Sequence, residues 1–483
     1  MRGQGRRIIF DVTTSFRWRG PPAGIVRVER NFALWALNNL RNVTFVIFDS
    51  RQDGYYELTW DLQAVLDGAA TFLSSRLAEP VREGGRKTNA LPLWLRPLVL
   101  WVRNRRRILL GRLELVRLQA KWRALARLVG ILQFALMTQK YRDVMVAADG
   151  SRLPFLRQNA WVGGRVDCTT GDVLVSVGAG WDNTNIGAIR ELKARGGFCF
   201  ILLCHDLIPL LFPHFYKSID VDAFRAYMHE ALALADLVVV TSQKGEQDCR
   251  AYCQERGVKV PKMAISPLGF DGPDPIEPVS STIALPNGLV RGRFAMMVST
   301  IEPRKGHQLL YRVWRRLVEE GIAQANGFKL AFVGRRGWMV DELISQIVSD
   351  RTVSGQIEII HDVSDRQLRS LYAGAAFCVF PSKYEGYGLP ICEAFAHGRT
   401  VIASTGGAIP EIVGTLSPCL DPDDDEVWYE TIKEWIQSPT RRLPYEQAIK
   451  RQFKHPTWRE AAANFFAISD CCAREHWGHR RLS

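Results

Sequence analysis

Two glutamates around a glycine-containing segment have the types and spacing that best suit chemistry in this 483-residue chain. Seven residues separate Glu385 from Glu393, and the segment between them begins Gly386-Tyr387-Gly388-Leu389. A carboxylate accepts hydrogen bonds readily from hydroxyl groups. Backbone N–H groups at the start of a helix favour an anion such as phosphate. A ligand with both phosphate and hydroxyl groups is a nucleotide sugar, which is the ligand we expect here.

A strand and a helix must hold this segment in place. Residues 376–380 form a short apolar run that predicts a buried strand, and the glycine-containing loop follows it. Pro390 suits the first positions of a helix, and His397-Gly398 provides a basic last turn and a glycine stop. The backbone N–H groups of Gly386, Gly388 and Leu389 would then lie at a helix N-terminus.

A second strand-loop-helix unit follows at once. Residues 400–403 predict another buried strand, Gly406-Gly407 a tight loop and Pro410-Glu411 a helix start. Two such units in succession predict a parallel sheet with its ligand at the carboxyl ends of the strands. The alternative is that the glycines are ordinary turns and the glutamates an ordinary acidic first turn.

A basic pair lies in a comparable place earlier in the chain. Residues 294–299 predict a strand, and Arg304 and Lys305 follow it at the start of a helical pattern. Two cations there could hold a diphosphate and stabilise the charge that grows on it as a sugar departs. Cationic pairs are also common on protein surfaces without such a role.

The first half of the chain offers two further candidates. Gly24 opens a helical pattern after a predicted strand at 7–12, which makes a second phosphate-facing platform or an ordinary strand-to-helix turn. His205 follows a predicted strand at 198–204, next to Asp206. A histidine there can donate a hydrogen bond to a sugar hydroxyl or share a proton with it, although a lone histidine is more often structural.

Composition bounds the class of protein. The hydrophobic content of 47% and charged content of 23% are ordinary for a globular chain, and the length predicts two or more domains. The basic N-terminus is followed by only a very short apolar run, so we expect no secretory signal. Apolar runs stay below the roughly 18 residues of a spanning helix. We therefore expect a cytoplasmic protein, either free or peripheral on the membrane surface.

The net charge of +13 is concentrated in one segment. Residues 86–142 contain fourteen basic residues and one acidic residue, Glu114, which accounts for the whole surplus. If 103–129 is helical, the basic residues lie largely outside an apolar stripe, as in an amphipathic helix on an anionic bilayer. The alternatives are a helical insertion packed on its domain and a nucleic-acid patch. Nothing resembling a nucleic-acid module accompanies the charge, so no such partner is expected.

Metal ligation is not expected. The ten cysteines are scattered without a zinc-type spacing, which favours reduced, structural thiols. The acidic triplet Asp423-Asp424-Asp425 precedes a helical pattern and is best interpreted as a helix start.

The motifs together resemble glycosyltransferase family 4. The glutamates around GYGLP, the following GGAIPE loop, the EPRKG segment and the HDLIP stretch at 205–209 carry the resemblance, although the GGAIPE loop is one residue longer than the family's usual form. Members are retaining enzymes with the GT-B fold, in which two Rossmann-like domains face each other across a cleft. The resemblance covers most of the chain except about residues 50–141.

The resemblance implies roles for the candidates. Arg304 and Lys305 would bind the donor diphosphate, and Glu385 the hexose hydroxyls. Glu393 would take the ribose hydroxyls, and His205 would face the sugar from the other domain. The nucleotide-binding set is Gly24, Gly386, Tyr387, Gly388, Leu389 and Glu393.

The expected domains are an N-terminal Rossmann-like acceptor domain (1–270, with the basic insertion at 86–142), a linker (271–288) and a C-terminal donor domain (289–455). A C-terminal helix at 456–483 either crosses back to the first domain or caps the second.

The expected reaction moves a hexose, with mannose favoured, from a nucleoside diphosphate to a hydroxyl of a lipid-linked glycan in bacterial surface polysaccharide assembly. GDP-mannose is the favoured donor, and dTDP-rhamnose and UDP-glucose stay open. We expect neither a separate cofactor nor a metal. The alternatives are a nucleotide-sugar epimerase on the same fold and a non-catalytic membrane-associated binding protein.

Overall fold

The structure is a computed structural model that describes residues 6–18, 24–49, 53–58, 162–272 and 285–480, together with Leu62 and Leu66. The chain divides into two compact units, of which the first holds residues 1–15, 23–55 and 167–483 and the second 16–22 and 56–166. The insertion expected at 86–142 and most of the expected linker lie outside the described residues.

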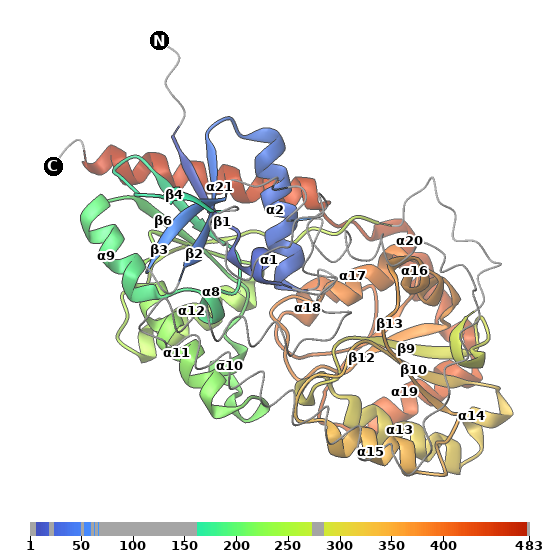
Figure 1. The fold of residues 1–483 in the computed structure, drawn as a ribbon. Helices are drawn as coiled ribbons and strands as arrows, with labels where there is room; N and C mark the ends of the chain where they lie inside the picture. Colours follow the sequence, from blue (N-terminus) through green and yellow to red (C-terminus); the bar gives the residue numbers. More distant parts are fainter. Residues whose placement is uncertain are drawn as a thin grey trace, which may run out of the picture. The chain divides into compact units, whose positions relative to one another are not determined.

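A parallel sheet forms the first half of the larger unit (Figure 1). Its strands follow the order β2-β1-β5-β6-β7-β8 and pair in parallel throughout. Central strands buried on both faces are apolar along their whole length, as the sequences CFILLC and LVVV of β6 and β7 illustrate. The strands are β1 (Ile8–Asp11), β2 (Val43–Asp49), β5 (Val173–Ser176), β6 (Cys199–Cys204), β7 (Leu237–Val240) and β8 (Lys262–Ile265).

Helices connect these strands. Each of the longer ones directs an apolar stripe at the sheet, as α2 does with Val28, Phe32 and Ala36. The helices are α1 (Thr13–Arg17), α2 (Ile25–Asn39), α8 (Gly180–Asn183), α9 (Ile186–Gly196), α10 (Ile208–Leu211), α11 (Ser218–Leu234) and α12 (Gln243–Glu255), with a short 3₁₀ turn η3 (Pro213–Phe215).

The second unit's described strands form an antiparallel pair. Strand β3 (Gly54–Leu58) continues into this unit, where Tyr56 lies opposite Arg165 and Leu58 opposite Val162 of β4 (Val162–Arg165). None of the candidate site residues lies on these strands.

A second parallel sheet fills the C-terminal half of the larger unit. Its order is β11-β10-β9-β12-β13-β14, so the order reverses beside β9, which lies between β10 and β12. Such a reversal is where open α/β sheets bind ligands, at the carboxyl ends of the strands. The strands are β9 (Phe294–Val298), β10 (Lys329–Val333), β11 (Ile357–Ile360), β12 (Phe377–Phe380), β13 (Val401–Ser404) and β14 (Cys419–Leu420).

Two apolar clusters cover the faces of this second sheet. One is built around Trp314 and Trp428, and the other around Tyr372 and Phe395. The helices that supply them are α13 (His307–Glu319), α14 (Ile322–Ala325), α15 (Asp341–Ser349), α16 (Asp365–Gly374), α17 (Leu389–Ala396), α18 (Ile409–Val413), α19 (Asp425–Gln437) and α20 (Leu443–Gln452), with 3₁₀ turns η4 (Pro286–Gly288), η5 (Pro303–Lys305) and η6 (Pro439–Arg441).

The last helix, α21 (Trp458–Arg480), follows the second sheet in the chain but packs on the first (Figure 1). Phe466 stacks on Trp35 of α2 with ring centroids 5.1 Å apart, and Phe465 lies 5.1 Å from Phe32. Aromatic pairs at this separation bury large apolar areas. The helix therefore belongs to the core of the first sheet, far in sequence from the strands it covers.

The two parallel sheets confirm the predicted α/β fold class of two Rossmann-like domains. Asp424 caps α19 by accepting from the N–H groups of Glu426 and Val427, so the acidic triplet does begin a helix. Within the described residues, no helix combines the length and the apolar character that crossing a membrane requires.

Candidate functional site

The loops that carry the basic pair and the first glutamate are neighbours, because β9 and β12 pair side by side. The Lys383 N–H donates to the Arg304 carbonyl at 2.7 Å. Gly306 follows the basic pair with φ +82°, and a Cβ there would lie 2.4 Å from the Pro381 carbonyl oxygen. Only glycine accepts both that backbone angle and that contact. The close approach of the two loops brings the charged side chains together.

Four charged groups form one buried cluster. Glu385 lies between two cations, with Lys305 Nζ at 2.6 Å and Arg304 Nη1 at 2.8 Å. Glu302 lies on the other side of Arg304, with Oε1 2.9 Å from Nε. Arg304 also donates to the Tyr384 carbonyl at 2.8 Å. The four side chains are each 13% exposed or less, so the interactions act in a weakly screened environment.

The pKa shifts follow from that burial. Burial alone would raise the pKa of Glu385, but Arg304 and Lys305 overcome it and lower the pKa to about 2. For Lys305, burial and the neighbouring guanidinium lower the pKa, against the pull of Glu385. Burial raises the pKa of Glu302. Glu385 is therefore a permanent carboxylate at neutral pH, suited to accepting hydrogen bonds and not to donating a proton.

The second glutamate has two partners. Glu393 Oε1 accepts from Arg27 Nη1 at 2.8 Å, and Oε2 accepts from the Tyr372 hydroxyl at 2.9 Å. Arg27 belongs to α2 of the first sheet, three residues after Gly24, whose carbonyl accepts from the Arg27 N–H at 3.1 Å. The glycine caps the start of α2 with φ +51°. Arg27 thus links the predicted Gly24 turn to Glu393.

The glycine-containing segment between the glutamates has a different role at each position. Gly388 caps the start of α17 with φ +136°, and Leu389 is the first helical residue. The Tyr387 side chain is buried, and its hydroxyl lies 2.9 Å from His455 Nε2. The Gly386 carbonyl accepts from the hydroxyls of Thr241 and Ser242, each at 3.1 Å.

His205 lies against the same segment. A Cβ on Gly386 would lie 2.5 Å from the His205 carbonyl oxygen. The His205 Nε2–H donates to the Val177 carbonyl at 2.8 Å, and burial lowers the pKa of the ring. Its imidazole is therefore held neutral, with Nδ1 as the acceptor nitrogen. The structure thus brings His205, Arg304, Lys305, Glu385 and Gly386 into one region.

Enlarging Gly386 is expected to disturb this region. Gly386→Ala places a methyl group 2.5 Å from the His205 carbonyl and 2.7 Å from Asp206 Cβ. Because the first of these is backbone that can move only together with its loop, we expect destabilisation of about 1–3 kcal/mol, measured by urea unfolding. The matched control is Gly272→Ala, where a Cβ meets nothing within 4 Å. Equal stability of the two variants would contradict the packing described.

Sequence reasoning missed three charged residues in this region. Arg27 and Glu302 are described above. Glu411 accepts from the backbone N–H groups of Gln243 and Lys244 at the start of α12, at 2.8 and 2.7 Å. The sequence held a signal for Glu302, which lies in the EPRKG segment, and for Glu411, which ends the GGAIPE loop. For Arg27 and Glu411, the partners are far apart in the chain.

A buried carboxylate, Glu29, also lies in the first domain. Glu29 of α2 is 1% exposed, accepts from the Ser15 N–H at 2.5 Å and faces Gly178 in the loop after β5. Thr14 completes the link between the two loops, because its hydroxyl accepts from the Ala179 N–H at 2.8 Å. Burial, with a smaller contribution from Asp11, raises the pKa of Glu29 to about 8.

This shift predicts a pH dependence. The folded chain keeps the Glu29 proton up to about pH 8, whereas the unfolded chain releases it near pH 4.5. The stabilising contribution of Glu29 is therefore complete below about pH 4.5 and falls as the pH rises to about 8. Glu29→Gln mimics the protonated acid, so wild type should lose stability relative to this variant between pH 5 and 8. A difference in melting temperature between wild type and Glu29→Gln that stays constant from pH 5 to 8 would contradict the assignment.

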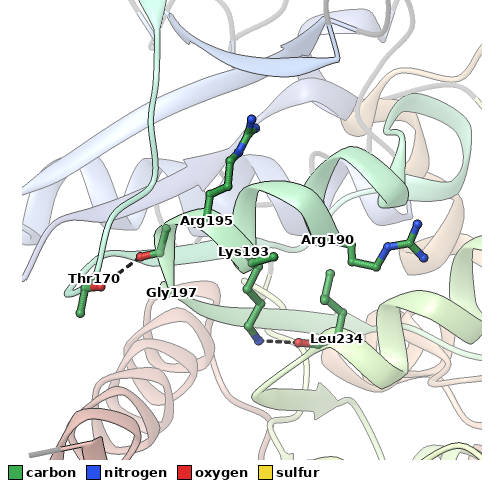
Figure 2. Close-up of a pocket in the computed structure, with 8 residues that line it drawn as sticks. Thr170, Arg190, Lys193, Arg195, Gly197 and Leu234 are labelled. Atoms are coloured by element: carbon green, nitrogen blue, oxygen red, sulfur yellow. Dashed lines mark hydrogen bonds between the residues drawn. The ribbon is translucent and has the colours of Figure 1, made fainter.

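A pocket elsewhere on the first domain does not contain the predicted residues. It is lined by the end of α9 and its surroundings, including Thr170, Arg190, Lys193 and Arg195 (Figure 2). One of its basic side chains already has a partner in the chain, because Lys193 Nζ donates to the Leu234 carbonyl at 2.6 Å. The carbonyl groups at a helix C-terminus also disfavour an anion. We therefore place the candidate site at the charged cluster and not here.

Comparison with known proteins finds a family match over the second half of the chain. Residues 288–452, which span the second sheet and its site, match the family described as glycosyl transferases group 1. The chain is 29% identical over 241 residues to O-antigen chain mannosyltransferase B of Escherichia coli, covering 49% of this chain and 61% of that protein. It is 34% identical over 188 residues to the MMP alpha-(1->4)-mannosyltransferase of Mycolicibacterium hassiacum, covering 38% and 43%.

These relatives are matched only in part. The serotype-specific mannosyltransferase WbdA of Escherichia coli is 27% identical over 293 residues, which is 57% of this chain and 34% of that protein. Among solved structures, Anabaena Alr3699/HepE in complex with UDP and glucose superposes with a TM-score of 0.55 at 14% identity, covering 96% of this chain and 100% of that one. The chain therefore has the GT-B fold, and its residues 288–452 match the glycosyl transferases group 1 family.

Proposed function

We propose that this protein is a retaining mannosyltransferase that acts in bacterial surface polysaccharide assembly. Its donor is a nucleoside diphosphate sugar, with GDP-mannose favoured over dTDP-rhamnose and UDP-glucose, and its acceptor is a hydroxyl of a lipid-linked glycan. The observation that carries the proposal is the buried cluster of Arg304, Lys305 and Glu385 at the carboxyl ends of β9 and β12. The names of the relatives support mannose as the sugar.

The cluster suits a diphosphate leaving group. Arg304 and Lys305 present two cations on one loop, and both pair with Glu385. A diphosphate would share these cations with Glu385, whose remaining acceptor capacity then serves the hexose hydroxyls. The cations stabilise the negative charge that develops on the phosphate as its bond to the sugar breaks. Because they are already fixed by their carboxylate partners, little reorganisation is needed during the reaction.

Transfer with retention needs no side-chain base in this arrangement. The bond between the anomeric carbon and the phosphate oxygen breaks, and the acceptor oxygen bonds to the same face of that carbon. The proton of the acceptor hydroxyl passes to the departing phosphate oxygen. Glu385 is unsuited to donate a proton because its pKa is about 2, and the neutral His205 is suited to contact sugar hydroxyls through Nδ1.

Glu393 would bind the ribose of the donor. Its two oxygens accept from Arg27 and Tyr372, which fixes the plane of the carboxylate. A carboxylate oxygen has a second acceptor direction, so ribose hydroxyls can be added without loss of these partners. Gly388 and Leu389 open α17, and N–H groups at a helix start would favour phosphate.

We also propose that the protein works at the inner face of the cytoplasmic membrane. The support is the charge of residues 86–142, fourteen basic against one acidic, which suits an anionic lipid surface. Flotation on vesicles with and without phosphatidylglycerol tests this inference. Binding that requires the anionic lipid supports it, and equal flotation on both vesicles or on neither contradicts it.

The donor is tested by thermal stabilisation against a panel of UDP-, GDP- and dTDP-sugars. GDP-mannose is expected to raise the melting temperature most, since a ligand that binds only the folded state stabilises it in proportion to RT ln(1 + [L]/Kd). The control variant is Lys454→Ala, which changes an exposed lysine on the loop between α20 and α21 and should show the same shift in melting temperature as wild type. A lack of shift with every nucleotide sugar would contradict the donor assignment.

A further inference from the structure

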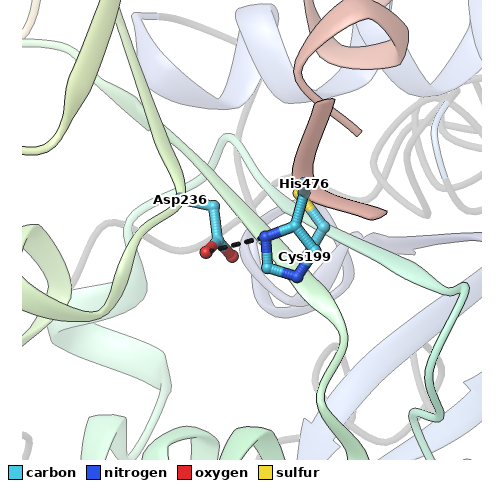
Figure 3. A group of neighbouring side chains, drawn as sticks. All are labelled: Cys199, Asp236 and His476. Atoms are coloured by element: carbon cyan, nitrogen blue, oxygen red, sulfur yellow. Dashed lines mark ion pairs between the residues drawn. The ribbon is translucent and has the colours of Figure 1, made fainter. Parts of the chain in front are cut away.

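Three metal-ligating side chains meet at the end of the first sheet that lies away from the candidate site. Cys199 is the first residue of β6, and Asp236 comes immediately before β7, its neighbouring strand. His476 comes from α21, which packs against both strands. Figure 3 shows the three side chains converging. One ligand atom from each lies within 4.8 Å of the others.

The separations suit a small tetrahedral ion. His476 Nδ1 lies 3.3 Å from Asp236 Oδ1. Zinc bonds to nitrogen and oxygen are about 2.0 Å long, which places two such ligands of a tetrahedron about 3.3 Å apart. The two atoms form an ion pair here, at a separation that also matches two ligands of one zinc ion.

A second thiol adjoins the group. Cys472 lies four residues before His476 on α21, so both side chains are on one face of the helix. Its thiol donates to the backbone carbonyl of Asp236 at 3.8 Å. Cys472 is 5% exposed and Cys199 is fully buried. Cys199, Asp236 and His476 bring one sulfur, one carboxylate oxygen and one imidazole nitrogen within 4.8 Å of one another, and Cys472 adjoins this group as a second sulfur. Zinc prefers this combination of donor atoms.

The surroundings orient the carboxylate as a ligand. Asp236 Oδ2 accepts from Lys193 Nζ at 2.6 Å and from the Phe200 N–H at 2.7 Å, which turns Oδ1 toward His476. Outer hydrogen bonds of this kind fix the ligands of metal sites. The charges also fit: two thiolates and a carboxylate exceed the charge of Zn²⁺ by one, and Lys193 supplies one positive charge.

We propose that Cys199, Asp236, Cys472 and His476 form a structural zinc site that fixes the C-terminal helix to the first sheet. Four protein ligands close the coordination sphere, as in structural and not catalytic zinc sites. The site lies at the amino-terminal ends of β6 and β7, whereas the charged cluster lies at carboxyl ends of the second sheet. The proposal therefore stands independently of the transferase reaction.

The test measures zinc in the purified full-length chain after saturation with Zn²⁺ and removal of excess, followed by replacement with Co²⁺. We expect one zinc per chain, thiolate-to-cobalt charge-transfer absorption, and a lower melting temperature after chelation. His476→Gln and Cys472→Ser should each lower the zinc affinity at least about tenfold. The matched control is Cys471→Ser, which changes the exposed neighbouring thiol on the same helix and should keep full zinc binding.

Two results would overturn the proposal. The first is less than about a tenth of an equivalent of zinc with no thiolate–cobalt absorption in the folded wild-type chain. The second is a Cys199–Cys472 disulfide, seen as loss of both thiols in intact-mass alkylation of the freshly purified protein. His476→Gln leaves every buried thiol in place, so it reports on metal binding even if the cysteine variants fold poorly.

Discussion

Lys305→Ala is expected to lower the turnover number by about 10²- to 10³-fold, the effect typical of losing one preorganised group that stabilises developing charge. Lys305 Nζ lies 2.6 Å from Glu385 in the charged cluster, where we propose that the leaving phosphate binds. The fold should persist, because Arg304 continues to neutralise Glu385 at 2.8 Å. The measurement is kcat at saturating donor, with the melting temperature as a check on folding.

Two further variants sharpen this test. Lys305→Arg keeps the charge but changes its geometry, and it should recover only part of the lost turnover. Lys454→Ala removes an exposed lysine and should leave turnover unchanged. Wild-type turnover in Lys305→Ala would show that the cluster is not the phosphate site.

Glu393→Ala is expected to weaken donor binding by roughly 10- to 100-fold, the range for losing hydrogen bonds to a charged group. The variant removes the oxygens that would accept from ribose hydroxyls, and it also frees Arg27 and Tyr372, which donate to Glu393 at 2.8 and 2.9 Å. Titration of nucleoside diphosphate into the variant measures the loss directly. The turnover number at saturating donor should change much less than the dissociation constant.

Arg27→Ala separates the loss of the Glu393 carboxylate from the release of its partner Arg27. If Arg27 only positions Glu393, its loss should raise the dissociation constant less than Glu393→Ala does. Glu430→Ala is the surface control, because this exposed residue pairs only weakly with Lys433 at 3.3 Å. Unchanged affinity in Glu393→Ala would contradict the ribose assignment.

The fold could be predicted because its strands are short apolar runs between polar loops. The predicted strands at 294–299 and 376–380 contain β9 and β12, and β13 is shifted by one residue from the predicted 400–403. Fully buried parallel strands must be apolar on both faces, which makes them visible in a sequence. The glycines at 306 and 388 were informative for a similar local reason, since their backbone angles exclude most side chains.

The pairings within the site could not be predicted in the same way. The sequence identified Arg304, Lys305 and Glu385 as candidates but could not show that the two cations share one carboxylate across 80 residues of chain. Arg27 reaches Glu393 across 366 residues, and no local periodicity records such a contact. Tyr387 was predicted as nucleotide-binding, whereas its hydroxyl in the structure lies at His455.

The proposed zinc ligands illustrate the same limit. Spacing rules recognise metal sites whose ligands come in close pairs, and here Cys199, Asp236 and His476 come from three elements. Only the helical pair Cys472 and His476 is local. The expectation of purely structural thiols followed from that spacing, and the metal analysis described above decides between the two.

The most direct test of the proposed reaction is transfer of labelled mannose from GDP-mannose to a mannose-terminated lipid-linked glycan, with the anomeric configuration of the product read by NMR. We predict release of GDP in step with formation of an α-linked product, because retention preserves the α configuration of the donor, and loss of both in Lys305→Ala. Formation of a β-linked product, or no transfer from any of the GDP-, UDP- and dTDP-sugars, would contradict the account.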